Sequence, residues 1–341
     1  MRIALILTGG TICSRTAADG ARRSDVGTAV TLLEKGYRNA HPYGDLHFDV
    51  TMPMNSLSED LTPEDWRTLL KAVADVDCRA VSGIIIAHGT DTLEQTSAML
   101  SAALIGIGVP VILVSAIAPL TEPQTNGHAN FAAAVRLIRR RLMPGVWAVY
   151  ENSDGEMYLH RGFALQPCQH GSISFYSDGM QRVEAVLEEE PVKAPPDRLD
   201  RTVLRKTAGT AAEVLLLHPY NGLRYDSISL DGVSAVVHGT YHSETANALR
   251  YSPYAVQTLL MRCQAAGIPC FLAPCRMTEQ SYGSSYDLVQ AGAIPLEDMP
   301  LPLAYAAVWL GCMQGLRGSV LTDRVRQLRH RLDSQFFRCC I

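Results

Sequence analysis

Several short segments of this chain are apolar at successive positions, and this feature constrains the fold more than any other. Residues 2–7, 80–87 and 109–114 are the clearest examples. Strands that are buried on one face alternate apolar and polar residues, whereas strands buried on both faces do not. Such segments, when they alternate with amphipathic helical patterns, are typical of a mostly parallel sheet covered by helices. The sequence therefore predicts an α/β fold.

Helical patterns lie between these strands. One begins with good capping chemistry: Thr62 can cap the helix, Pro63 loses only an N–H that would be unpaired, and Asp65 completes a capping box. Apolar residues then recur at helical spacing and mark a buried stripe, namely Trp66, Leu69, Leu70, Val73 and Val76. A helix over residues 129–142 and a strand over 146–150 continue the alternation.

The chain is long enough for two domains, since it has 341 residues, of which 47% are hydrophobic and 19% charged. We expect a larger N-terminal domain over residues 1–187 and a charged, proline-rich linker over 188–211. A smaller, flavodoxin-like α/β domain would follow over 212–341. Its strands are predicted at 212–217, 232–237 and 269–273, with a helix capped by Ser252, started by Pro253 and stopped by Gly267.

Charge and composition argue against several classes of function. A net charge of −4 provides no basic field for nucleic acid, and Arg136 with residues 139–141 is interpreted as the solvated face of a helix. No apolar stretch is long enough to cross a membrane. The nine cysteines, which include Cys339 and Cys340, show no metal-binding spacing, so we expect reduced thiols, no metal and a cytoplasmic location.

Two threonine motifs follow buried strands. The TGGTI motif (residues 8–12) comes after the first strand, and the HGTDT motif (residues 88–92) comes after the strand at 80–87. Ligands bind at the carboxyl ends of parallel strands, and the two glycines before Thr11 let the backbone turn sharply and present its hydroxyl. Thr11 is thus a candidate nucleophile, although a tight turn or a phosphate loop would use the same residues.

The HGTDT motif places a second hydroxyl beside a carboxylate. These are the groups needed for a proton relay and for binding a substrate ammonium. Asp91 could instead cap a helix that begins near Leu93, and the two roles are compatible. His88 is interpreted as structural, because a lone histidine at a strand end more often satisfies backbone groups.

The two motifs resemble the signature segments of bacterial-type L-asparaginases. Residues 55–66 look like the family's substrate-carboxylate loop, and residues 115–120 with Asn126 look like the segment after its fourth strand, where an aspartate is commoner than Asn126. The resemblance implies a homodimeric or homotetrameric amidohydrolase that hydrolyses L-asparagine to L-aspartate and ammonia through a threonine acyl-enzyme. It implies no cofactor.

The resemblance also implies roles for individual residues. Thr11 matches the nucleophile, Thr90 the second threonine, and Asp91 the carboxylate that binds the substrate amino group. Substrate-binding positions are Ser58, Glu59, Gly10 and Gly89. The segment from residue 13 to about 36 resembles the family's mobile lid.

The chain departs from the family pattern in two places. The family lysine after the fifth strand is missing, because the four lysines, at positions 35, 71, 193 and 206, lie outside the matching stretch 159–175. The lid segment also lacks a tyrosine. We expect His170, or a tyrosine such as Tyr282 or Tyr286 from a neighbouring subunit, to compensate.

Other functions remain open at this stage. A glutaminase or an ammonia-releasing amidotransferase-type subunit would use the same groups, with Glu59 and the lid setting the length of side chain admitted. A non-catalytic amino-acid binder would keep the pocket and lose the proton relay.

Overall fold

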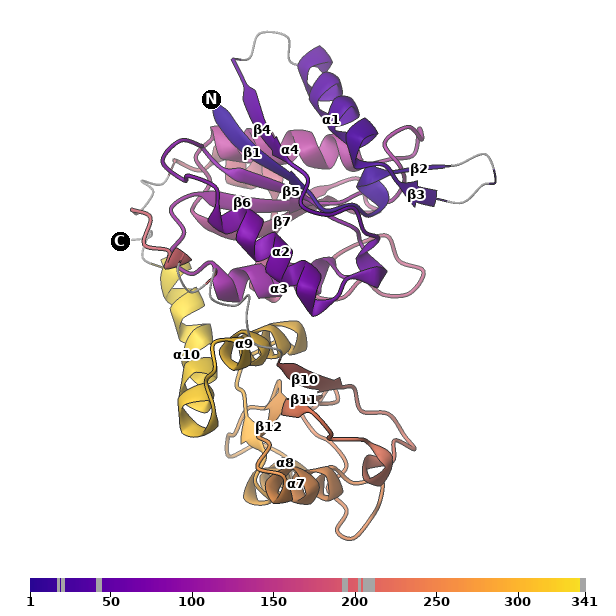
Figure 1. Ribbon diagram of the computed structural model, residues 1–341, viewed down its shortest axis with the longest axis vertical. Helices are drawn as coiled ribbons and strands as arrows, with labels where there is room; N and C mark the ends of the chain where they lie inside the picture. The colour runs from indigo at the N-terminus through magenta and orange to yellow at the C-terminus, as the bar shows by residue number, and fades with distance from the viewer. Residues whose placement is uncertain are drawn as a thin grey trace. The chain divides into compact units, whose positions relative to one another are not determined.

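The computed structural model describes residues 1–16, 19, 22–40, 45–191, 196–201, 204 and 212–337. Their contacts divide the chain into two compact units, Met1–Arg205 with Ser334–Ile341, and Lys206–Asp333 (Figure 1). Each unit is built on a mainly parallel sheet, so the predicted two-domain α/β fold is confirmed. Of the predicted linker, residues 192–195, 202, 203 and 205–211 lie outside the described residues, as do Cys339 and Cys340.

The first unit contains a seven-stranded sheet in the order β4-β1-β5-β6-β7-β8-β9. The first five strands of this order are parallel, and β8 and β9 are antiparallel to their neighbours. The strands are β1 (Arg2–Leu7), β4 (His47–Thr51), β5 (Ile84–Ala87), β6 (Pro110–Val114), β7 (Gly145–Glu151), β8 (Met157–Arg161) and β9 (Gln181–Arg182). A small hairpin of β2 (Ser14–Thr16) and β3 (Arg22–Ser24) stands apart from this sheet.

The central strands have the burial that their apolar sequences predict. All four residues of β5 are fully buried, and β6 is buried throughout. β5 begins at Ile84, later than the predicted start at residue 80. Two of the preceding residues also bond to β1: Ser82 donates its N–H to the carbonyl of Arg2, and the carbonyl of Gly83 accepts from the N–H of Ala4.

Helices cover both faces of this sheet. α1 (Val26–Ala40) and α4 (Gly127–Arg139) lie on one face, and α2 (Pro63–Ala74) and α3 (Leu93–Ala103) lie on the other (Figure 1). The capping box predicted for α2 is present, with Asp65 accepting from the N–H of Thr62 at 2.8 Å. Arg136 is exposed, as predicted, and pairs with Glu184 of α5 (Val183–Glu188).

The second unit has four parallel strands in the order β10-β11-β12-β13. They are β10 (Glu213–Leu217), β11 (Val233–Gly239), β12 (Cys270–Ala273) and β13 (Ile294–Pro295). Its helices are α7 (Val256–Ala265), α8 (Gly283–Gln290), α9 (Leu301–Met313) and α10 (Gly318–Phe337). The buried α9 packs against β10 and β11, so the apolar stretch at 301–309 is a core helix.

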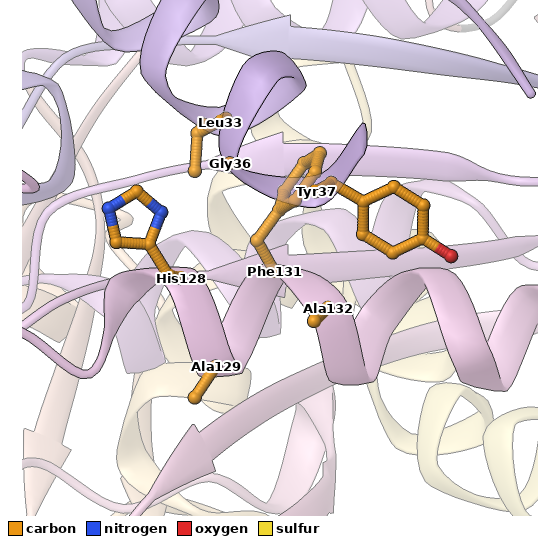
Figure 2. Close-up of a pocket in the computed structure, with 7 residues that line it drawn as sticks. All are labelled: Leu33, Gly36, Tyr37, His128, Ala129, Phe131 and Ala132. Carbon is orange, nitrogen blue, oxygen red and sulfur yellow. The ribbon is translucent and has the colours of Figure 1, made fainter. Parts of the chain in front are cut away.

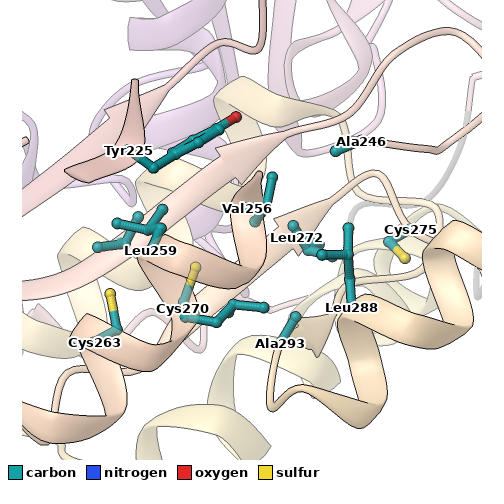
Figure 3. Close-up of a cluster of buried hydrophobic side chains, with 12 residues drawn as sticks. Tyr225, Ala246, Val256, Leu259, Cys263, Cys270, Leu272, Cys275, Leu288 and Ala293 are labelled. Carbon is teal, nitrogen blue, oxygen red and sulfur yellow. The ribbon is translucent and has the colours of Figure 1, made fainter. Parts of the chain in front are cut away.

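The predicted start of α7 is wrong. The helix begins at Val256, because residues 252–255 form a turn in which the N–H of Ala255 donates to the carbonyl of Ser252. Gly267, with φ of +68°, follows the end of the helix as predicted. Side chains from α7, β12 and α8 form the hydrophobic cluster of this unit, which includes Leu259, Cys263 and Leu288 (Figure 3).

The end of the chain differs from the expected domain limits. Residues 334–337 group with the first unit, and the side-chain amide of Gln335 donates to the carbonyl of Pro144 at 3.3 Å. The sequence prediction assigned these residues to the second domain. The helical pattern of α10 continues without a break, so the sequence does not indicate that the end of this helix belongs to the first unit.

Candidate active site

Three loops meet at the carboxyl ends of β1 and β5. The loop after β4 pairs with the TGGTI motif through a bridge between Ser56 and Gly9. The N–H of Gly10 donates to the carbonyl of Ser56 at 2.9 Å, and the N–H of Ser56 donates to the carbonyl of Thr8 at 3.0 Å. The side chain of Thr8 in turn donates to the carbonyl of Ala87, at the end of β5, at 3.0 Å. Backbone bonds thus fix the first motif against both neighbours.

The two threonine motifs are in direct backbone contact. A Cβ atom built on Gly10, whose φ is +73°, would overlap the Cα of Gly89. A Cβ on Gly89 would overlap the hydroxyl of Ser58. Only glycine fits at either position. Thr11 and Thr90 each follow one of these glycines in the chain, so the structure brings the two motifs together as the sequence predicts.

Asp91 is anchored through its backbone while its side chain stays open to solvent. Its N–H donates to the hydroxyl of Ser58 at 3.2 Å, and this hydroxyl is also 3.5 Å from Asp91 Oδ2. Thr92 Oγ1 donates to the carbonyl of Ser58 at 2.9 Å. The N-cap of α3 is Thr92, so the interpretation of Asp91 as the cap is wrong. The exposed carboxylate is free to bind a cationic group of a ligand.

The other predicted site residues lie on short 3₁₀ turns. Thr11 is partly exposed and begins η1 (Thr11–Cys13), and Thr90 is also partly exposed. Ser58 begins η2 (Ser58–Asp60), where it is buried, and Glu59 beside it is exposed. The Ser58 hydroxyl is engaged with Asp91, which makes this serine a support for the aspartate in the structure.

His88 has a structural role. Its ring is fully buried, and Nδ1 lies 2.8 Å from the carbonyl oxygen of Gly89. Burial lowers the pKa of His88 to about 4, so the imidazole is neutral near pH 7.

The loop after η3 (Gly162–Ala164) holds the stretch where the family lysine would lie. His170 in this loop is exposed. Cys168, two residues before His170, is half-buried and interacts electrostatically with both Asp91 and Glu94. Burial raises the pKa of the Cys168 thiol, which donates to the carbonyls of Ser172 and Ser174 at 3.4 and 3.3 Å.

Sequence reasoning missed Glu94. This residue lies in the first turn of α3, where an acidic side chain normally faces solvent and the positive end of the helix. Here the side chain is only 3% exposed, and its pKa is raised to about 7, first by burial and also by the charge of Asp91. The signal available in the sequence is its position two residues beyond the HGTDT motif.

The remaining predicted residues belong to other parts of the molecule. Tyr282 and Tyr286 are exposed on the second unit, and their contribution to a neighbouring subunit's site stays a prediction. The expected lid contains the β2–β3 hairpin, in which Thr16 donates to the carboxylate of Glu122 at 2.7 Å. Residues 17, 18, 20 and 21 of that segment lie outside the described residues.

A separate pocket lies between α1 and α4. It has a volume of about 320 Å³ and an apolar lining that includes Tyr37 and Phe131, whose rings meet edge to face (Figure 2). The ring of His128 closes one side, with Nε2 3.1 Å from the carbonyl of Leu120. None of the threonine-motif residues lines this pocket.

Within the described ranges, no three His, Cys, Asp or Glu side chains gather in a way that could hold a metal ion. Among the helices placed in the structure, none combines the length and apolar character that a membrane crossing requires.

Comparisons with known proteins agree with this fold. L-asparaginase I of Vibrio cholerae has the same fold, with a TM-score of 0.71 at 22% identity, covering 96% of this chain and 97% of that one. The thermostable L-asparaginase of Thermococcus kodakarensis matches with a TM-score of 0.69 at 20% identity, covering 96% of each chain. A glutamyl-tRNA(Gln) amidotransferase subunit from Pyrococcus horikoshii is 26% identical over 344 residues, which span 92% of this chain and 73% of that protein.

The family assignment follows from the sequence itself. The family model "Asparaginase, N-terminal" matches residues 2–191, more than half of the chain. That range contains the TGGTI and HGTDT motifs and the contact between Gly10 and Gly89. This chain therefore belongs to the asparaginase family.

Proposed function

We propose that this protein hydrolyses the side-chain amide of L-asparagine and releases L-aspartate and ammonia. The observation that carries the proposal is the backbone contact between Gly10 and Gly89, which supports a shared site for Thr11 and Thr90, the residues that follow these glycines. The exposed carboxylate of Asp91 at the same edge suits the α-ammonium group of an amino-acid substrate.

The proposed reaction has two steps. In the first, the hydroxyl of Thr11 attacks the amide carbon and loses its proton, and the C–N bond breaks as the nitrogen gains a proton and leaves as ammonia. In the second, water attacks the resulting β-aspartyl ester and loses a proton, and Thr11 regains its own. Backbone N–H groups near the two glycines can stabilise the oxyanion, a contribution of about 10²–10³ in rate for each donor.

A second candidate is an ammonia-releasing subunit that works with a partner. The observation in its favour is the 26% identity to a protein named as a glutamyl-tRNA(Gln) amidotransferase subunit, which extends over 92% of this chain. That function would use the same nucleophile and would accept glutamine. A non-catalytic amino-acid binder is the third outcome, since the family lysine is absent.

The test is release of ammonia by the purified protein from L-asparagine, L-glutamine and D-asparagine. We expect L-asparagine to be preferred and Thr11→Ala to lower kcat by at least about 10³-fold. Thr322→Ala on α10, which removes a hydroxyl bonded to Gly318, is the matched control and should keep full activity.

Each result separates the candidates. Preference for glutamine would favour the amidotransferase-type function. Binding of aspartate in calorimetry without ammonia release from any amide would favour the binder. Unchanged turnover in Thr11→Ala would refute the nucleophile assignment. Sedimentation of the same sample tests the expected homodimer or homotetramer.

A further inference from the structure

We propose that Glu94 is the group that stores and returns the catalytic proton behind Thr90, in the place where the family uses a lysine. This inference rests on the proposed amidohydrolase function and names a positioning residue for it. Glu94 would act through the HGTDT motif, without touching the substrate itself. Three observations support it: the burial of Glu94, the groups around it, and the neutral thiol of Cys168 in the loop after η3.

The side chain of Glu94 is buried and incompletely paired. It lies in the first turn of α3, three residues after Asp91, and is 3% exposed. Its Oε2 atom is buried and has no hydrogen-bond partner in the described part of the chain. A carboxylate oxygen without a partner in a buried place is costly, whereas a protonated carboxyl is tolerated there. The environment therefore favours a proton on Glu94.

The groups that interact with Glu94 come from two loops and from α3 itself. Asp91, from the loop after β5, and Cys168, from the loop after η3, both interact with it electrostatically. The buried Tyr150 of β7 interacts electrostatically with Cys168. Gln95, the next residue of α3, bonds the Glu94 carboxyl and favours its charged form. The negative charge of Asp91 acts in the opposite direction and favours the neutral acid.

Cys168 explains why Glu94 can hold a proton in this chain. A lysine in this loop would place a positive charge near Glu94 and keep it ionised. A thiol carries no positive charge, and burial keeps Cys168 in its neutral form. With a neutral thiol in this loop, burial and the charge of Asp91 favour the protonated form of Glu94. Its pKa of about 7 is suited to accepting and returning a proton near neutrality.

The proton can be followed through both steps. When Thr11 attacks the amide, a proton passes by way of Thr90 to the Glu94 carboxylate, and it returns to the departing nitrogen as the C–N bond breaks. When water attacks the ester, its proton takes the same path and is returned to the oxygen of Thr11. Glu94 ends each step ionised, so no external acid or base is consumed.

The experiment measures kcat and KM for ammonia release from L-asparagine between pH 5 and 9. The expected wild-type profile rises through an apparent pKa near 7. Glu94→Gln should lower kcat by about 10²-fold or more, change KM little, and abolish the rise near neutrality. Glu94→Asp, which keeps a carboxyl group, should retain a pH-dependent rise and recover part of the activity.

A second pair of variants tests the role of Cys168. Cys168→Lys restores a positive charge beside Glu94 and should move the rise to lower pH by at least about one unit. Gln169→Lys is the matched control, because residue 169 is exposed in the same loop and adds the same charge. An equal shift in both variants would show a general charge effect and overturn the assigned pairing of Cys168 with Glu94.

Failure of this inference can be told apart from failure of the proposed function. An active wild type whose pH profile is unchanged in Glu94→Gln overturns the inference and leaves the amidohydrolase standing. A wild type without ammonia release refutes the function and, with it, the catalytic use of the proton. In that case the infrared carbonyl band of a neutral carboxyl still tests the site. A wild-type band that disappears as the pH is raised through 7, and that Glu94→Gln lacks, supports the buried proton. A wild type without such a band overturns the inference.

Discussion

Replacing Glu94 by glutamine should stabilise the first unit at alkaline pH and have little effect in acid. The pKa of Glu94 is raised from 4.5 to about 7 in the folded protein because its side chain is buried. Below pH 4.5 the carboxyl is protonated in both folded and unfolded chains, so it carries no penalty. As the pH rises toward 7 the unfolded chain loses this proton first, and folding stability falls.

The size of the effect follows from the shift in pKa. A tenfold change in an ionisation constant corresponds to about 1.4 kcal/mol, so a rise from 4.5 to about 7 costs the folded protein about 3 kcal/mol above pH 7. Glutamine has nearly the same shape and does not ionise. The variant should therefore exceed the wild type in stability by about 3 kcal/mol at pH 8, with the difference vanishing near pH 4.5.

Urea unfolding followed by tryptophan fluorescence measures this difference. Trp66 reports on the region, because its indole N–H donates to Thr96 of α3 at 3.2 Å. The two units can unfold separately and Trp309 lies in the second, so the transition of the first unit is the one to compare. Glu188→Gln, at the exposed end of α5, is the matched control and should leave stability unchanged at both pH values. An equal pH dependence in wild type and Glu94→Gln would refute the reasoning.

Two further predictions concern the backbone of the first unit. Gly10→Ala should abolish activity and lower Tm by several degrees, because the added Cβ would overlap Gly89. Gly171→Ala is the matched control, since Gly171 has the same φ of +73° with open space around it. This control should show only the smaller cost of that backbone conformation. Comparable losses in thermal melting of both variants would contradict the contact. Asp65→Ala removes the capping box of α2 and should lower the free energy of unfolding of the first unit by about 1 kcal/mol in urea, with activity kept. An unchanged free energy of unfolding would show that solvent replaces the cap.

The fold was predictable wherever local sequence and burial agree. β1 runs over the predicted residues 2–7 because an unbroken apolar run leaves few alternatives, and α2 begins at Pro63 because its capping chemistry is encoded within four residues. The start of α7 was missed for the opposite reason. Ser252 and Pro253 are as good in a turn as in a helix start, and tertiary contacts decided between them.

The site was predictable in its frame and less so in its chemistry. The contact of the two motifs follows from parallel strands that end at one edge of the sheet. The conformation of the loop after η3 depends on distant contacts; in it Cys168 is half-buried and interacts electrostatically with Asp91, whereas His170 is exposed. Glu94 could not be recognised, because a glutamate in the first turn of a helix is ordinarily a solvated residue.

The glycine-to-glycine contact between the threonine motifs also limits how such an enzyme can diversify. Neither loop has space for a side chain at that point, so a substitution on one cannot be offset by a smaller residue on the other. We therefore expect selection for a longer or bulkier amide to act at Glu59 or on the β2–β3 hairpin. Engineering libraries aimed at new substrates should leave residues 9, 10 and 89 fixed and randomise Glu59 and the β2–β3 hairpin.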